Sequence, residues 1–146
     1  MTAHPLGSPS TDPVTALSLG RITLGAVTIG NPELGARLFQ LDVGNNKQLP
    51  YLTRMFGSRE IALGTLTLLA RGKARRRLVL AGIAVDGADA YAGVAAGQDG
   101  SVSKNTSALL AGHAAVAALA GVVSLRRARR TGRAAIKGSP AVGAPV

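Results

Sequence analysis

The sequence has no cysteine and no tryptophan, and aromatic residues make up only 3% of it. The absence of cysteine excludes disulfides, thiolate metal sites and thiol redox chemistry. Charged residues are also scarce, at 16%, against roughly 25% in an ordinary soluble domain. With so few rings, a large aromatic-anchored core is not expected. Alanine and glycine dominate instead, which suits close contact between helices, and 146 residues suit one domain.

Catalytic signatures are missing as well. Neither of the glycine-rich phosphate loops, GxGxxG and GxxxxGK[ST], is present. No nucleophile–base pair and no metal-binding motif stands out. The sequence therefore predicts a protein that is not an enzyme and that needs no metal and no cofactor.

The positive charge is concentrated in two places. The net charge is +10, and eleven of the seventeen basic residues fall in the runs RGKARRR (71–77) and RRARRTGRAAIK (126–137). A high pI is typical of nucleic-acid binders, but also of membrane proteins with basic cytoplasmic loops. Each run adjoins an apolar stretch, and neither is interleaved with aromatic or amide side chains that read bases. Nucleic acid is therefore the less favoured partner, and the lipid bilayer the favoured one.

Four apolar segments follow one another with short connections. The clearest, 107–125, contains nineteen residues without a formal charge and would span roughly 28 Å as a helix, about the hydrocarbon thickness of a bilayer. The other three contain arginines, a glutamate and two aspartates. Their regular spacing nonetheless predicts an all-α fold, an antiparallel bundle of four transmembrane helices. The expected spans are about 14–30, 50–71, 77–97 and 106–126.

The basic runs provide a separate test of this arrangement. Lys and Arg accumulate in the cytoplasmic loops of membrane proteins, and four spans place both runs on one side, whereas three would separate them. We therefore predict a multi-pass protein of the bacterial plasma membrane with both termini cytoplasmic. Residues 1–13 are expected to be a flexible lead-in without signal-peptide features, 31–41 a short interfacial helix, and 127–146 a basic, disordered cytoplasmic tail.

Each predicted span carries an ionisable side chain roughly 12–15 Å from its nearer end. A lone charge at that depth costs at least ~2.5–3.5 kcal/mol on insertion scales, so these groups should not face lipid. We expect the aspartates to point towards the two arginines and the histidine of the other helices. The predicted intramembrane polar network consists of Arg21, Arg59, Glu60, Asp86, Asp89 and His113.

Small and polar residues share a helix face with these groups in every span. Membrane helices pack closely on such stripes. The predicted inner stripes are Ser18, Arg21, Gly25 and Thr28; Thr53, Gly57, Glu60, Gly64 and Thr67; Gly82, Asp86, Asp89 and Gly93; and Thr106, His113, Ala117, Ala120 and Ser124. The predicted packing positions are Gly25, Gly57, Gly64, Gly82, Gly93 and Ala117. Lipid headgroups are expected at Arg75, Arg76, Arg77, Arg126, Arg127, Arg129 and Arg130.

The network has two interpretations. Its two arginines nearly cancel its three carboxylates, and a protonated His113 would bring the sum to zero; otherwise one carboxyl would hold a proton. The network could be structural and fix the register of the helices. It could instead bind a ligand or handle a proton, the default hypothesis for ionisable groups inside a membrane.

Three segments carry a family resemblance: LGRITLGAVTI, LTRMFGSREIALGTLTLLARG and AGIAVDGADAYAG. Over roughly residues 14 to 125 the chain resembles small four-helix integral membrane proteins of actinobacteria, a domain of unknown function loosely similar to the DoxX-like group. The most specific elements are R-x-F-G-x-R-E and D-G-x-D, which supply Arg54, Phe56, Gly57, Arg59, Glu60, Asp86, Gly87 and Asp89. The resemblance implies a membrane bundle and no established activity. Thiol or quinone redox partners fit poorly with a chain that lacks cysteine.

Three functions remain open at this point. The first is a binding or accessory membrane subunit that assembles with itself or with another membrane protein. The second is a proton-coupled carrier, or a protein that handles lipids or small molecules. The third is a soluble basic helical protein associated with nucleic acid.

Overall fold

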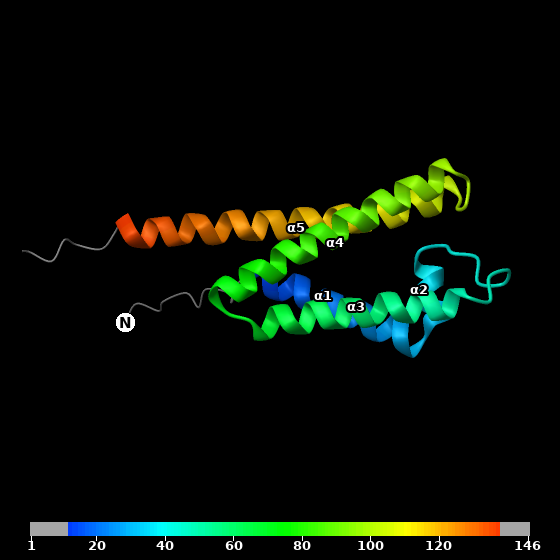
Figure 1. Ribbon diagram of the computed structural model, residues 1–146, viewed down its shortest axis with the longest axis horizontal. Coiled ribbons are helices and arrows are strands. Elements are labelled where there is room, and N and C mark those ends of the chain that lie inside the picture. Colours follow the sequence, from blue (N-terminus) through cyan, green and yellow to red (C-terminus); the bar gives the residue numbers. More distant parts are fainter. Residues whose placement is uncertain (1–11, 138–146) are drawn as a thin grey trace, which may run out of the picture.

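The computed structural model describes residues 12–137, and the side chains of residues 12–127. Within these residues every regular element is a helix, as Figure 1 shows, and the predicted all-α fold is confirmed. The helices are α1 (Pro13–Gly30), α2 (Pro32–Leu38), α3 (Leu49–Leu69), α4 (Gly72–Gln98) and α5 (Lys104–Lys137).

The five helices form two closely packed pairs. Helix α1 packs along α3, and α4 packs along α5, whereas α3–α4 and α1–α5 touch much less. The short helix α2 closes one end of the first pair and contacts both α1 and α3. In Figure 1 the turn between α3 and α4 and the end of α5 lie at one end of the molecule, and α2 and the α4–α5 turn lie at the other.

Local sequence explains where the helices begin and end. Pro13 and Pro32 stand at the starts of α1 and α2, where a missing N–H costs nothing. Asn31 separates the two helices, and its side chain accepts a hydrogen bond from the N–H of Leu34 at 3.0 Å, which caps α2. The turn before α4 uses Gly72 at φ +55°, a left-handed conformation that glycine adopts without strain.

The distribution of polar and apolar side chains is the reverse of that in a soluble domain. Among the described residues the buried apolar side chains are small in number: Ala36, Leu49, Val79 and Ala114. More than twice as many buried residues are polar or charged: Ser18, Arg21, Thr28, Thr53, Glu60, Thr67, Asp86, Thr106 and Ser124. Large apolar side chains are exposed on the outside of every helix. Soluble proteins bury such side chains, so this surface is suited to an apolar solvent.

Four of the buried hydroxyls form hydrogen bonds within their own helices. Ser18, Thr53 and Ser124 each donate to the carbonyl oxygen four residues earlier, at 2.7–2.8 Å. Thr28, which is fully buried, lies 3.0 Å from the carbonyl oxygens of Leu24 and Gly25. A polar interior can therefore form without water, as a bilayer requires.

Three helices are long and apolar enough to cross a membrane: Pro13–Gly30, Gly72–Gln98 and the Lys104–Arg127 part of α5. They correspond to the first, third and fourth predicted spans. Helix α3, the second, is not among them, and it carries Arg54, Arg59 and Glu60. Length and hydropathy thus support a membrane protein with three candidate spans. Whether α3 is an additional span depends on where its charged side chains lie.

Two predicted boundaries differ from the structure. Residues 127–137 were expected to be disordered, but α5 continues through them to Lys137. Ala and Arg are strong helix formers, so the helix continues past the apolar stretch. Helix α1 begins at Pro13, inside the predicted lead-in. The rest of the lead-in, 1–11, and the end of the tail, 138–146, lie outside the described residues.

Candidate functional site

A buried arginine joins three helices. Arg21 of α1 donates from Nη1 to Oε2 of Glu60 on α3 at 2.7 Å, and from Nη2 to Oδ2 of Asp86 on α4 at 2.5 Å. The side chains of all three residues are less than one-tenth exposed. Hydrogen bonds between ionised groups are the strongest that side chains make. Arg21 therefore ties the two helix pairs together.

A second arginine makes a parallel link between α3 and α4. Arg59 forms a bidentate pair with Asp89, with Nη1–Oδ1 at 3.0 Å and Nη2–Oδ2 at 2.5 Å. The guanidinium of Arg59 also lies over the ring of Phe56, 5.0 Å from its centre. Nη2 of Arg59 is 3.5 Å from Oε1 of Glu60, so the two arginine pairs form one continuous cluster.

His113 does not join this cluster. Its ring stands edge-on to Phe39, with ring centres 5.5 Å apart, and it forms no hydrogen bond or ion pair with any described residue. Asp86 and Asp89 therefore bind the two arginines, and among the described residues neither makes a polar contact with His113. The buried side of α5 instead carries Thr106, Ala114, Gly121 and Ser124, and His113, next to Ala114, lies at its edge. Small residues can approach α4 more closely than an imidazole can.

The cluster has one more acidic group than basic groups. We define the ion cluster as Arg21, Arg59, Glu60, Asp86 and Asp89. It carries two guanidiniums and three carboxylates. Oε1 of Glu60 and Nε of Arg59 are buried without a hydrogen-bond partner among the described residues. An unsatisfied buried acceptor on a charged group costs more than a neutral one, so Glu60 is the least well satisfied acid of the cluster.

The ion cluster lies at the bottom of a large cleft between the two helix pairs. The cleft has a volume of about 690 Å³, and residues from all five helices line it. Arg21, Glu60, Asp86, Asp89 and His113 provide its polar lining. Its walls are otherwise mostly apolar and include Leu17, Leu24, Phe39, Leu52, Phe56 and Leu110. The arrangement is an apolar chamber with charges at one place, which is typical of small-molecule sites.

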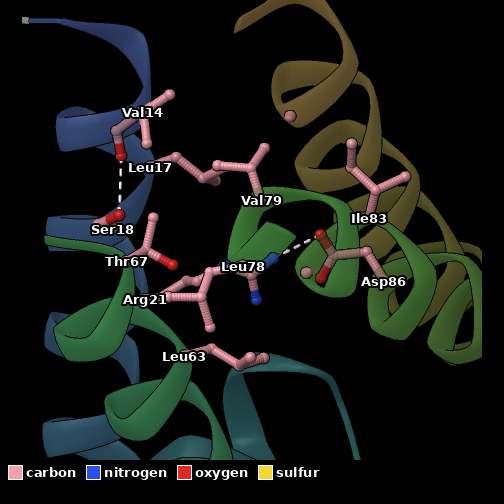
Figure 2. Close-up of a pocket in the computed structure, with 12 residues that line it drawn as sticks. Val14, Leu17, Ser18, Arg21, Leu63, Thr67, Leu78, Val79, Ile83 and Asp86 are labelled. Atoms are coloured by element: carbon pink, nitrogen blue, oxygen red, sulfur yellow. Dashed lines mark hydrogen bonds and ion pairs between the residues drawn. The ribbon is translucent and has the colours of Figure 1, made fainter. Parts of the chain in front are cut away.

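A much smaller cavity lies on the other side of Arg21 (Figure 2). Its volume is about 20 Å³, roughly enough for one water molecule. Figure 2 shows Leu17, Leu63, Leu78 and Val79 around it, with the Arg21–Asp86 pair at its edge. Arg21 and Asp86 line both cavities. The ion pair thus stands between the large cleft and the end of the bundle at which α3 turns into α4.

Most of the predicted packing glycines lie where two helices touch. A Cβ added to Gly25 would lie 2.5 Å from the carbonyl oxygen of Gly57, and one added to Gly64 would lie 2.7 Å from that of Ser18. Both contacts join α1 to α3. Gly93 similarly faces the N–H of Ala111, at 2.8 Å from an added Cβ, and joins α4 to α5.

The remaining two packing positions have other surroundings. An added Cβ at Gly82 would lie 3.5 Å from Nη2 of Arg21, so this glycine leaves room for the guanidinium. Ala117 is half-buried and lines the cleft. Gly121 makes a close contact that was not predicted. A Cβ added there would lie 2.7 Å from the side chain of Ile83.

The arginines predicted to contact lipid headgroups lie near the start of α4 and in the second half of α5. Arg76, Arg77, Arg126 and Arg127 are exposed, and the side chains of Arg129 and Arg130 lie outside the described residues. Arg75 differs, because its Nη2 is bound to Oδ2 of Asp12 at 2.5 Å. This pair ties the start of α1 to the start of α4. The hydrogen bond and charge of Arg75 outweigh the effect of partial burial and lower the pKa of Asp12 below its usual value of 3.8.

The sequence analysis did not place Phe39 and Phe56 in the cleft, and it missed the Asp12–Arg75 pair. Phe56 stands four residues before Glu60, on the same face of α3, and this spacing could have placed it in the cleft. No group of His, Asp and Glu side chains in residues 12–127 is arranged to hold a metal ion. Comparison of the chain with protein-family models, curated proteins and solved structures finds no match.

Proposed function

We propose that the chain is a four-span membrane protein that binds an amphiphilic molecule in the cleft between its two helix pairs. In this proposal α3 spans the membrane in addition to the three candidate helices α1, α4 and α5. Its 21 residues would reach roughly 31 Å. Arg59 and Glu60 pair with side chains of other helices, whereas Met55, Leu66 and Leu69 face outward. Arg54, near the outer end, can extend its charge to the interface.

The position of the basic residues supports the orientation. Arg76 and Arg77 stand at the start of α4, and Arg126 and Arg127 on the distal half of α5. Figure 1 places both regions at the same end of the bundle. With four spans, the positive-inside tendency then puts this end and both termini in the cytoplasm of a bacterial cell. The likeness to the actinobacterial four-helix family is part of the same proposal and rests on the R-x-F-G-x-R-E and D-G-x-D elements.

The observation that carries the proposed function is the cleft itself. A chamber of about 690 Å³ falls within the usual range for ligand sites, roughly 300–1,000 Å³. Its walls suit a hydrocarbon tail, and the ion cluster suits a polar head. A ligand with only one of these parts would leave either apolar walls or charged groups without a partner.

The geometry favours binding over transport. Beyond Arg21 and Asp86 the interior narrows to about 20 Å³, with leucine and valine side chains around it (Figure 2). A carrier would have to break the Arg21–Asp86 pair and separate these side chains. The outer surface of the helices exposes leucine and valine side chains. Such a surface also argues against the nucleic-acid alternative.

The absence of cysteine permits a direct test with single labels. Ala92 lines the cleft, whereas Val94 on the same helix is 44% exposed and does not line it. A fluorophore is attached to Ala92→Cys or to Val94→Cys in lipid nanodiscs. A long-chain alcohol carrying a nitroxide quencher is then added in increasing mole fraction. Quenching should saturate at low mole fraction at position 92 and should rise linearly at position 94.

A variant that fills the cleft completes the test. Ala96→Phe places a ring in the lining and should abolish the saturable component at position 92 while the protein remains folded. Linear quenching at both positions, with or without the added ring, would show that the cleft holds no site and would refute the proposed function.

A further inference from the structure

We propose that the cleft selects amphiphiles with a cationic ammonium headgroup. This inference rests on the proposed function and adds the chemical class of the ligand. It depends on three features of the cleft: its charge balance, one buried carboxylate oxygen, and arginines that are already paired with carboxylates.

The charge balance favours a cation. The charged groups that line the cleft come from α1, α3 and α4: Arg21, Glu60, Asp86 and Asp89, with Arg59 bound to Asp89 beside them. Three carboxylates face two guanidiniums, so one negative charge is uncompensated as long as the imidazole of His113 is neutral. In a low-dielectric interior such a charge is strongly stabilised by an opposite one. One ammonium group would make the cluster neutral.

Glu60 provides the specific acceptor. Glu60 is only 4% exposed and lines the cleft, yet its Oε1 accepts no hydrogen bond from any described residue. Among the described residues, Oε1 itself forms an ion pair only with Nη2 of Arg59, at 3.5 Å, and that nitrogen already donates to Asp89 at 2.5 Å. Buried carboxylate oxygens are normally hydrogen-bonded. An ammonium headgroup would supply the missing positive partner.

An anionic headgroup would compete with the carboxylates for the arginines. Both Nη atoms of Arg21 and both of Arg59 already donate to carboxylates. Nε of Arg59, which donates to no described residue, is buried and belongs to a guanidinium held by Asp89. His113 is the remaining possible donor in the lining. A carboxylate or phosphate there would meet the excess negative charge of the cluster. The ring of Phe39, which also lines the cleft, attracts cations and not anions.

The test uses the label at Ala92→Cys with three quencher probes that share one tail. Their headgroups are primary ammonium, alcohol and carboxylate. We expect the ammonium probe to saturate at a mole fraction at least about tenfold lower than the alcohol, equivalent to ~1.4 kcal/mol, and the carboxylate probe to bind most weakly. Glu60→Gln should remove the preference for ammonium over the alcohol.

Two controls separate selectivity from folding. Glu33→Gln removes an exposed acid of α2 that is paired only with Arg37, and it should leave the preference intact. If Glu60→Gln does not fold, Asp89→Asn, whose side chain is 32% exposed, should reduce the preference in the same way. Saturable binding that is equal for all three probes, or tightest for the carboxylate, overturns the ammonium assignment but not the cleft site. The loss of saturation for every probe overturns the proposed function instead.

Discussion

Nη1 of Arg21 lies 2.7 Å from Oε2 of Glu60, across the closely packed interface of α1 and α3. Both side chains are less than one-tenth exposed, while leucine, methionine and tyrosine side chains cover the outside of the same helices. A membrane helix that carries ionisable groups must direct them into the bundle and its apolar side chains towards the lipid. This pair would allow α3 to cross a membrane, as the proposed four-span arrangement requires, despite its low hydropathy.

The close approach of α1 and α3 predicts a strong effect from a small substitution. Gly25→Ala places a Cβ 2.5 Å from the backbone oxygen of Gly57, and backbone cannot move aside as a side chain can. We expect a loss of about 1–3 kcal/mol in unfolding free energy, measured by denaturation in detergent. Gly20→Ala, on the same helix with nothing within 4 Å, should be neutral or slightly stabilising. Equal effects of the two changes would contradict the packing.

The bidentate pair of Arg59 and Asp89 predicts that lysine cannot replace Arg59. Lysine keeps the charge but loses the planar fork that binds both oxygens of Asp89. Arg59→Lys should cost about 1–2 kcal/mol of stability, while Arg54→Lys, at an exposed position of the same helix, should be neutral. Thermal unfolding of the two purified variants provides the measurement. A stable Arg59→Lys variant would show that charge alone suffices here.

Much of this site could be predicted from the sequence because the polar residues of an apolar helix must face the interior of the bundle. The predicted stripe of α1, with Arg21 and Gly25, coincides with its buried face, and that of α3 coincides except for Leu49. Helical periodicity is enough for such faces. On α5 the periodicity placed Thr106 and Ser124 correctly on the buried side, but it could not show that His113 lines the cleft without joining the ion cluster.

Other features depend on contacts between distant segments that no local pattern encodes. The partner of each arginine is set by how the two helix pairs cross. The cleft exists because α1 and α5 touch little. Helical periodicity indicates which faces are buried but not how far apart two helices lie. Asp12 was assigned to a flexible lead-in since its partner, Arg75, lies 63 residues away.

The four-span topology predicts where single cysteines are accessible. Labels at Lys73 and at the C-terminus should react with membrane-impermeant thiol reagents only from the cytoplasmic side, and labels at Asn45 and Gly100 only from outside. Because the natural chain has no cysteine, each signal comes from one position. Lys73 and the C-terminus on opposite faces of the membrane would rule out α3 as a span and leave three crossings.

The pair of Asp12 and Arg75 predicts a small pH-dependent contribution to stability. The pKa of Asp12 in the folded protein is lowered below 3.8, so the contribution is present above that pH and is lost as the pH falls through the folded pKa. Asp12 is about half exposed, and solvent screening limits the effect to at most ~1 kcal/mol. The difference in melting temperature between the wild type and Asp12→Asn should be small at pH 7 and should vanish near pH 2. A constant difference would mean that the carboxylate charge has no role.

The strongest prediction concerns which carboxylates depend on Arg21. Arg21→Leu removes the partner of both Glu60 and Asp86 and leaves two buried charges. Breaking a buried pair costs ~3–5 kcal/mol in soluble proteins and less where membrane helices find other polar partners.

Neutralising a stranded acid should recover part of that loss. The double variants of Arg21→Leu with Glu60→Gln or with Asp86→Asn should therefore be more stable than the sum of the single losses predicts, whereas Asp89→Asn should add without coupling, because Asp89 is held by Arg59. Double-mutant cycles of unfolding free energy measure these terms. Coupling of Arg21 to Asp89 alone would show that the arginines exchange partners, and the two helix pairs would then have to cross differently.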